Sequence, residues 1–183
     1  VSFTPYGGPE DTCLCAHCAS AWHDFLVAAR AAGRTELPAD FALARASTDA
    51  ARRALETGEA PPIEAWLLRR EFTQSVVQAR LAELARTARG LRPSAPLGLL
   101  GLIGRTAFGG VAVDRVLPAL DFAECYRVGG ARELLFTLRS PSQRVVQTIF
   151  FDAGSAAAPA WCAWESWLRG ADGLVVWSDR ELV

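Results

Sequence analysis

The alternation of short apolar segments with helical segments after residue 96 constrains the fold more than any other feature of this sequence. The apolar segments are nearly continuous, which is typical of parallel strands that are buried on both faces. They cover residues 97–103, 120–126, 144–151 and 174–177, and helical segments are expected between them at 113–117, 131–138 and 159–169. Strands that alternate with helices indicate βα units around a parallel sheet. The sequence therefore predicts an α/β fold.

The first half of the sequence is expected to be mainly helical. Apolar residues recur at helical spacing in residues 19–32 and over the long segment 63–89. A shorter Ala/Arg-rich helix is expected near residues 47–57, between turn-forming prolines and glycines. Residues 1–3 could form the end of a further strand.

Length and charge limit the classes of function. The chain has 183 residues, which fits a single domain of ordinary size. We expect one domain, with a cysteine cluster and helix over 13–33 and βα units over 63–183. The formal net charge of −1 gives no reason to expect a nucleic-acid partner. No apolar run approaches the roughly 20 residues of a membrane span, so no membrane partner is expected.

Four strands and the end of a fifth cannot close a barrel. A complete (β/α)8 or TIM barrel contains about 250 residues. The chain is therefore either an open α/β sheet or the C-terminal part of a barrel whose other strands lie upstream of Val1. The sequence contains no Gly-x-Gly-x-x-Gly turn and no Walker-type loop, which disfavours a nucleotide-binding open sheet.

Three of the five cysteines lie within six positions, at Cys13, Cys15 and Cys18. Thiolates at this spacing can converge on one tetrahedral ion, and their softness favours zinc. The alternative is that these are ordinary thiols without a ligand role. An odd number of cysteines in such a cluster disfavours a secreted disulfide framework and predicts a structural zinc site in a reducing, cytoplasmic compartment. The candidates for a fourth ligand are His17, His23, Cys125, Cys162 or a cysteine upstream of the chain.

Four stretches of the sequence, in order, resemble the zinc-carrying family-42 β-galactosidases. They are the cysteine cluster with Trp22 and Phe25, Arg69-Arg70-Glu71-Phe72 with Val76-Val77, Leu120-Asp121-Phe122-Ala123 with Tyr126, and the run from Trp164 to Gly173. The second stretch resembles the family's Arg-Arg-Phe start of a long helix, and the third resembles the family's Leu-Asp-Phe-Ala strand. The resemblance implies the C-terminal half of a TIM-barrel glycoside hydrolase.

The resemblance also implies two catalytic carboxyl groups, which retaining enzymes hold about 5–5.5 Å apart. The family's acid/base precedes a Tyr-Gly pair, but Thr4 and Pro5 precede Tyr6-Gly7 here, and proline cannot carry the proton. Glu10 or Asp11 could replace it only in a remodelled loop. The position of the nucleophile corresponds to Asp152, after an apolar strand; a turn or helix-capping role is the alternative.

Further candidates lie near the ends of the strands, where barrel enzymes keep their functional groups. Glu124 could bind a sugar hydroxyl or serve as a replacement acid, or it could be a solvated strand end. Tyr126 and Trp177 are candidate sugar-binding aromatics, since flat rings stack on the apolar faces of sugars; for Trp177, core packing is the alternative. Glu165 lies within a helix between tryptophans and is expected to be structural.

Two functions follow from these expectations. The first is a β-galactosidase-like domain, retaining if active, that acts on or binds carbohydrate and carries a structural zinc. The second is a catalytically inactive, zinc-stabilised structural or interaction domain. The sequence leaves open whether the chain forms a homo-oligomer.

Overall fold

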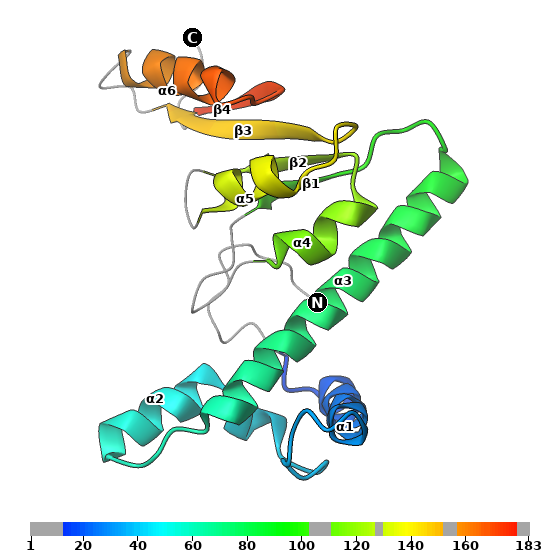
Figure 1. Ribbon diagram of the computed structural model, residues 1–183, viewed down its shortest axis with the longest axis vertical. Coiled ribbons are helices and arrows are strands. Elements are labelled where there is room, and N and C mark those ends of the chain that lie inside the picture. Colours follow the sequence, from blue (N-terminus) through cyan, green and yellow to red (C-terminus); the bar gives the residue numbers. More distant parts are fainter. Residues whose placement is uncertain (1–12, 103–110, 127–129, 152–156, 179–183) are drawn as a thin grey trace. The chain divides into compact units, whose positions relative to one another are not determined.

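The computed structural model describes residues 13–102, 111–126, 130–151 and 157–178 (Figure 1). The chain divides into two compact units, residues 1–77 and 78–183. The first unit is helical and the second is an α/β sheet. The division falls within the long helix α3, whose first part belongs to one unit and whose last part belongs to the other.

The first unit contains α1 (Ala16–Ala31), the short 3-10 helix η2 (Leu43–Ala46), α2 (Thr48–Thr57) and the start of α3 (Ile63–Leu91). The ends of α2 have clear local causes. The Ser47 hydroxyl accepts a hydrogen bond from the Ala50 N–H at 3.0 Å, which caps the first turn. Gly58 ends the helix with a φ of 76°, a backbone conformation that favours glycine.

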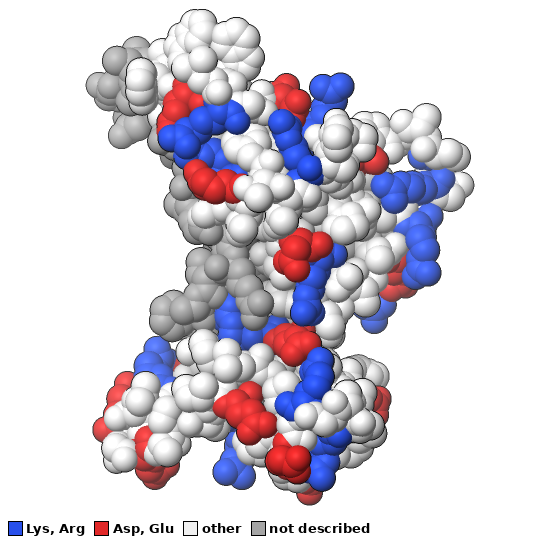
Figure 2. Space-filling model, viewed as in Figure 1, with Lys and Arg blue, Asp and Glu red and all other residues white. Residues whose placement is uncertain are grey.

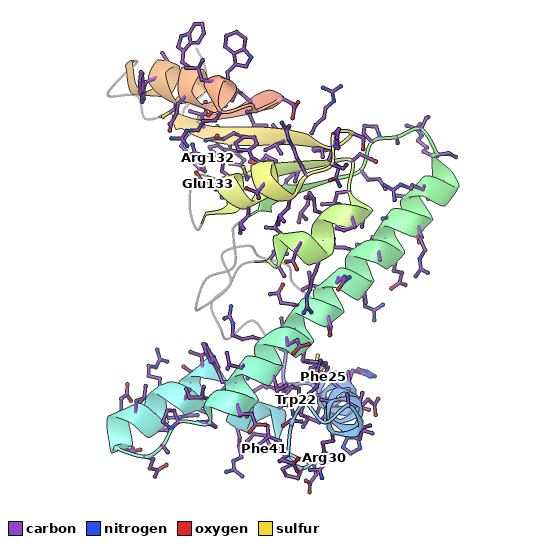
Figure 3. The ribbon with its side chains drawn as sticks, in the orientation of Figure 1. Trp22, Phe25, Arg30, Phe41, Arg132 and Glu133 are labelled. Carbon is purple, nitrogen blue, oxygen red and sulfur yellow. The ribbon has the colours of Figure 1, made fainter. Side chains whose placement is uncertain are left out.

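An aromatic cluster forms the core of the first unit (Figure 3). Trp22 stacks on Phe25 with 5.7 Å between ring centroids and meets Phe72 of α3 edge-on at 5.5 Å. The indole N–H of Trp22 donates to the Phe41 carbonyl at 2.7 Å, so its polar atom is satisfied inside the core. These contacts join α1 to the first part of α3 and to the segment between them. Their burial orients the start of α1, which carries the cysteines.

The second unit is built on four parallel strands in the order β1-β2-β3-β4. The strands are β1 (Gly98–Leu102), β2 (Phe122–Cys125), β3 (Arg144–Phe151) and β4 (Gly173–Ser178). The connecting helices are α4 (Val113–Val116), followed by the 3-10 turn η3 (Leu117–Ala119), then α5 (Ala131–Leu138) and α6 (Ala157–Leu168). The predicted α/β fold with a parallel sheet is confirmed. The described strands do not close into a barrel.

The strand order places the connecting helices on one face of the sheet. Each connection joins neighbouring strands in the same direction, and such crossovers are right-handed in nearly all proteins. In agreement, α5 packs on β2 and β3, and α6 packs on β3 and β4 (Figure 1). Barrels are wound in this way, whereas doubly wound sheets reverse the strand order and cover both faces.

The two faces of the sheet differ in burial. On the face toward α5 and α6, the residues of the central strands are 0–4% exposed: Ala123, Cys125, Val145, Gln147 and Ile149. The opposite face is called the open face here and carries Glu124, Tyr126, Val146, Thr148, Phe150, Val175 and Trp177. On that face Phe150 and Trp177 are more than half exposed, whereas Glu124 and Thr148 are only 4% and 2% exposed. The exposure therefore lies at β4 and at the carboxyl end of β3 and not over the whole face.

An arginine–aspartate arrangement occurs twice at the amino ends of the strands. Arg89, at the end of α3, bonds the Asp121 carboxylate and the Ala119 carbonyl, while Asp121 accepts the Leu97 N–H at 2.8 Å. Arg139, after α5, bonds the Asp172 carboxylate and the Gly170 carbonyl. Asp172 in turn accepts the Val145 N–H at 2.8 Å.

In both arrangements the aspartate lies directly before one strand and accepts a backbone N–H at the start of the strand that comes before it in the sequence. Asp121, before β2, accepts from Leu97, immediately before β1, and Asp172, before β4, accepts from Val145 in β3. The sheet thus contains two similarly built pairs of βα units, a repeat that is not visible as sequence similarity.

Candidate functional site

The three cysteines of the first unit lie together at the start of α1. Cys15 is the residue that precedes the helix, and Cys18 lies in its first turn. The Sγ atoms of Cys13, Cys15 and Cys18 are all within 4.8 Å of one another. Three thiolates on one tetrahedral zinc lie about 3.8 Å apart, as follows from a Zn–S bond of about 2.3 Å. The predicted convergence of the cysteines is confirmed, and the cluster could hold a metal ion.

The cysteine thiols differ in acidity. The backbone N–H of Cys18, followed by the side chains of Cys13 and Cys18, lowers the pKa of Cys15 to about 7. Burial, followed by hydrogen bonding with Cys15, raises the pKa of Cys18 to about 11. A thiolate is the form that binds metal, so Cys15 is the most readily available ligand of this pair near neutral pH.

The fourth ligand remains a prediction. Among the described residues, the metal-capable group contains the three cysteines alone. His23 Nδ1 is 2.9 Å from the Ala39 carbonyl oxygen, and His17 is exposed. Cys125 and Cys162 belong to the second unit, and burial raises the pKa of the Cys125 thiol to about 12.

Glu124 lies in β2 and is buried, with 4% of its surface exposed. Its carboxylate accepts a hydrogen bond from the backbone N–H of Gly101 in β1, where a φ of 70° favours glycine. Burial raises the pKa of Glu124, and the hydrogen bond from Gly101 opposes this effect in part. The interpretation as a solvated strand end was wrong, because neighbouring residues enclose the carboxyl group. A buried carboxyl with a raised pKa can stay protonated and donate a hydrogen bond or a proton.

Three aromatic side chains follow one another across the open face. The Tyr126 and Phe150 rings lie 5.3 Å apart between centroids, with 54° between their planes. Phe150 of β3 is paired in register with Trp177 of β4, so both side chains point to the same side of neighbouring strands. Phe150 and Trp177 are 56% and 55% exposed, which excludes the core-packing alternative for Trp177 within the described structure. We call Tyr126, Phe150 and Trp177 the aromatic row.

Sequence reasoning identified Tyr126 and Trp177 but missed Phe150. An apolar residue within a β-branched strand gives no sign of its face until the register with β4 is known. Thr148 was also missed. Thr148 lies on the open face two residues before Phe150 and is 2% exposed, and its hydroxyl has no hydrogen-bond partner among the described residues. Such a group is available to a ligand hydroxyl or a water molecule.

Several predicted residues lie outside the described residues. They are Pro5, Glu10, Asp11 and Asp152, and the predictions for them stay untested. Glu165 lies in α6 and pairs with Arg169 at 3.0 Å and with Arg132 of α5 at 3.6 Å. This pairing supports its expected structural role, because it links two neighbouring helices. The segment Arg69–Phe72 lies within α3, which begins at Ile63, and does not start a helix.

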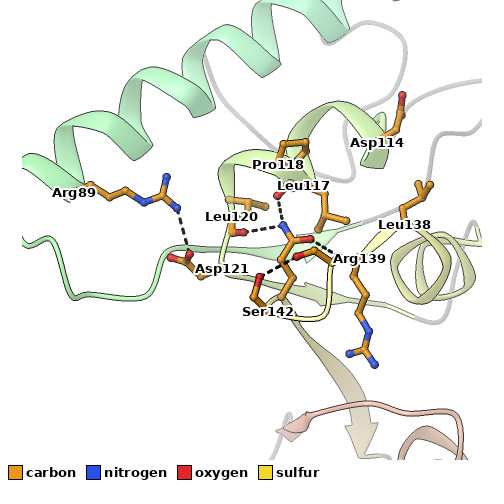
Figure 4. A pocket seen from close by; sticks show the side chains of 11 residues that line it. Arg89, Asp114, Leu117, Pro118, Leu120, Asp121, Leu138, Arg139 and Ser142 are labelled. Carbon is orange, nitrogen blue, oxygen red and sulfur yellow. Dashed lines mark hydrogen bonds and ion pairs between the residues drawn. The ribbon is translucent and has the colours of Figure 1, made fainter.

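A cavity of about 560 Å³ opens at the other end of the sheet, beside the amino ends of β2 and β3 (Figure 4). Arg89 and Asp121 pair on its wall at 3.3 Å. The Gln143 amide donates to the Leu117 and Leu120 carbonyls at 2.6 and 2.9 Å. The bonds of these three side chains serve the sheet and its connections, so we interpret the cavity as part of the scaffold.

Comparison with known proteins gives no relative: no family model, no curated protein and no solved structure matches this chain. None of the described helices is long and apolar enough to cross a membrane. In Figure 2, acidic and basic residues are interspersed over the drawn face, without a continuous basic patch on it.

Proposed function

We propose that this chain is a glycosidase-barrel relative, β-galactosidase-like, whose open face binds a sugar ring. The observation that carries the proposal is the aromatic row, in which Phe150 of β3 and Trp177 of β4 are paired in register and Tyr126, directly after β2, contacts Phe150. Exposed aromatic rings in water are costly, and an apolar sugar face is a partner that covers them without needing a deep pocket. The helices that connect the strands lie on one face of the sheet, as they do in barrels, which supports the same proposal.

Polar groups beside the aromatic row suit the hydroxyl groups of a sugar. Glu124 lies in β2 on the same face as Phe150 and Thr148 of β3, and Tyr126, which directly follows β2, contacts the Phe150 ring. The raised pKa of Glu124 suits a donor to a sugar hydroxyl, or an acid that assists the departure of a glycosidic oxygen. The Thr148 hydroxyl lies on the same face. Hydrolysis with retention also needs a nucleophile, and Asp152 is the residue that we propose for it.

The cysteine cluster is proposed to hold a structural zinc. Cys13 and Cys15 before α1 and Cys18 in its first turn supply three soft thiolates, which matches the ligand set that zinc prefers. Bound there, zinc would fix the segment before α1 to the start of that helix. No catalytic step is assigned to it.

Two assays test the proposal. Sugar-dependent thermal shifts measure binding, and hydrolysis of nitrophenyl glycosides measures catalysis. Trp177→Ala and Phe150→Ala should each weaken binding about 5- to 50-fold, as expected for the loss of a stacked ring. Trp164→Ala is the matched control, because Trp164 is similarly exposed but lies on α6. Asp152→Ala should abolish hydrolysis and leave binding nearly intact.

The second candidate is a zinc-stabilised interaction domain without a sugar ligand. The exposed tryptophans of α6 favour it, since such a patch on a small domain usually marks a contact surface. A protein whose stability responds to zinc but to no glycoside would support this candidate against the first.

A further inference from the structure

The segment Cys15-Ala16-His17-Cys18 brings two thiols together at the start of α1. Cys15 directly precedes the helix and Cys18 lies in its first turn, and their Sγ atoms are within 4.8 Å of each other. Residues three apart on a helix have Cβ atoms about 5–6 Å apart, and a disulfide needs about 3.5–4.5 Å, so a shift of about 1–2 Å joins the two sulfurs. The two thiols are therefore close enough to form a disulfide without refolding of the helix.

The core of the first unit holds Cys18 in place. The Cys18 side chain is half-buried and packs against the aromatic cluster that contains Trp22 and Phe72. The Ala19 N–H donates to the Cys15 carbonyl at 2.9 Å, so the backbone of Cys15 is tied to the same turn. These contacts keep the two sulfurs together without needing a metal ion.

The two thiols differ in their access to solvent. Cys15 is exposed, whereas Cys18 is half-buried. Peroxides oxidise the cysteines that solvent can reach, and sensor cysteines often lie beside a second cysteine that resolves the product. Cys13 is a second neighbour of Cys15, but Cys18 is the one that belongs to the helix and packs against the core. The segment thus combines an exposed thiol with a sheltered thiol that is fixed beside it.

We propose that Cys15 is a site of reversible oxidation by hydrogen peroxide, and that Cys18 converts the product into a disulfide. The Cys15 sulfur attacks one peroxide oxygen, the O–O bond breaks, and water leaves with the thiol proton as Cys15 becomes a sulfenic acid. The Cys18 sulfur then attacks the Cys15 sulfur, the S–O bond breaks, and a second water leaves with the Cys18 proton. One peroxide is reduced to two waters, and the two thiols lose two electrons in all.

The disulfide and a bound zinc exclude each other. Zinc is held by thiolates, and the disulfide removes two of the three sulfurs of the cluster. Oxidation therefore releases zinc, and bound zinc slows oxidation. An excess of a small thiol reverses the change by exchange, in which the small thiol becomes the disulfide and both cysteines are reduced. The disulfide itself needs only the cysteine sulfurs, so this inference does not rest on the proposed zinc.

The first test maps the disulfide in the full chain after treatment with hydrogen peroxide, with and without prior removal of metal by a chelator. The remaining thiols are blocked, the protein is denatured, and chymotrypsin cleaves after Leu14, which separates Cys13 from the other two cysteines of the cluster. Mass spectrometry should find a disulfide between Cys15 and Cys18 within one peptide, and the small thiol should remove it. A disulfide that links Cys13 to Cys15, or no disulfide in the metal-free chain, would overturn the proposal.

Substitutions separate the two steps. Cys18→Ala should leave Cys15 as a sulfenic acid that dimedone traps, because the resolving thiol is lost. Cys15→Ser should leave Cys18 unoxidised at the same dose of peroxide. Cys162→Ala is the matched control, since Cys162 is a half-buried cysteine of α6, and its disulfide between Cys15 and Cys18 should form as in the wild type. Circular dichroism establishes that each variant is folded.

Release of zinc, followed with a chromogenic chelator, distinguishes this inference from the zinc proposal. Peroxide should release zinc from the wild type and from Cys162→Ala in step with formation of the disulfide. A chain that forms the disulfide but never binds zinc would support the oxidation site and contradict the zinc site. A sulfenic acid absent from Cys15 in the metal-free Cys18→Ala variant would contradict the oxidation site.

Discussion

At the scale of single residues, Cys15 and Glu124 show how position changes chemistry. The backbone N–H of Cys18 lowers the pKa of the Cys15 thiol, whereas burial raises the pKa of the Glu124 carboxyl. Each shift has a consequence that can be measured.

Cys15 should be the most reactive thiol of the pair that it forms with Cys18 when metal has been removed. With a pKa of about 7 it is about half ionised at neutral pH, whereas Cys18, with a pKa of about 11, is almost fully protonated. Brief alkylation at pH 7 and peptide mass spectrometry should find Cys15 labelled many-fold faster than Cys18. Zinc should suppress the labelling. Equal alkylation rates for the two thiols, or alkylation of Cys15 that zinc does not slow, would contradict this account of the cluster.

Glu124 should make the fold less stable as the pH rises. Its pKa is raised in the folded state, so its protonated form stabilises the fold below the unfolded pKa of about 4.3, and this contribution is lost as the pH rises through the folded value. Glu124→Gln stays neutral and keeps an acceptor for the Gly101 N–H. The free energy of unfolding of the variant, relative to wild type, should therefore increase between about pH 4 and pH 7. Parallel pH curves for the two proteins would show that the carboxyl is not buried as described.

At the scale of elements, the long helix and the strands could be predicted from the sequence. Helix α3 was expected over 63–89 and found over Ile63–Leu91, and β3 was found with the predicted bounds, Arg144–Phe151. The spacing of apolar residues indicates where helices and strands lie, because the positions that are buried in the fold are the ones that must be apolar. It does not reveal which strand residues share a face across strands, which is why Phe150 and Thr148 were missed.

The repeated arginine–aspartate arrangement gives a prediction at the same scale. Asp172→Ala removes the acceptor of the Val145 N–H and the partner of Arg139, and Asp121→Ala does the same for Leu97 and Arg89. Because the bonds are alike, the two substitutions should destabilise by similar amounts, about 1–3 kcal/mol each. Chemical denaturation measures this.

Asp114→Ala is the control, since Asp114 is an exposed aspartate of α4. Its cost should stay within about 0.5 kcal/mol, as is usual for a surface substitution. A control as costly as the other two, or very unequal costs at Asp121 and Asp172, would show that the repeat does not hold the strands as proposed.

At the scale of the whole molecule, the sequence indicated the fold class more clearly than the site. The α/β class follows from the order of apolar and helical segments, which is a local property. The two compact units and the faces of the sheet depend on contacts between distant residues, such as the pairing of Phe150 with Trp177. The convergence of the cysteines was predictable because all three lie within six positions.

The most direct test of the central claim is fluorine NMR of the protein labelled with 5-fluorotryptophan during titration with a β-galactoside. Replacement of single tryptophans by phenylalanine assigns the resonances. The account predicts that the Trp177 resonance shifts and saturates with ligand, while those of Trp161, Trp164 and Trp167 on α6 stay in place. Movement of the α6 resonances with Trp177 unchanged, or no movement of any resonance, would contradict a sugar site on the open face.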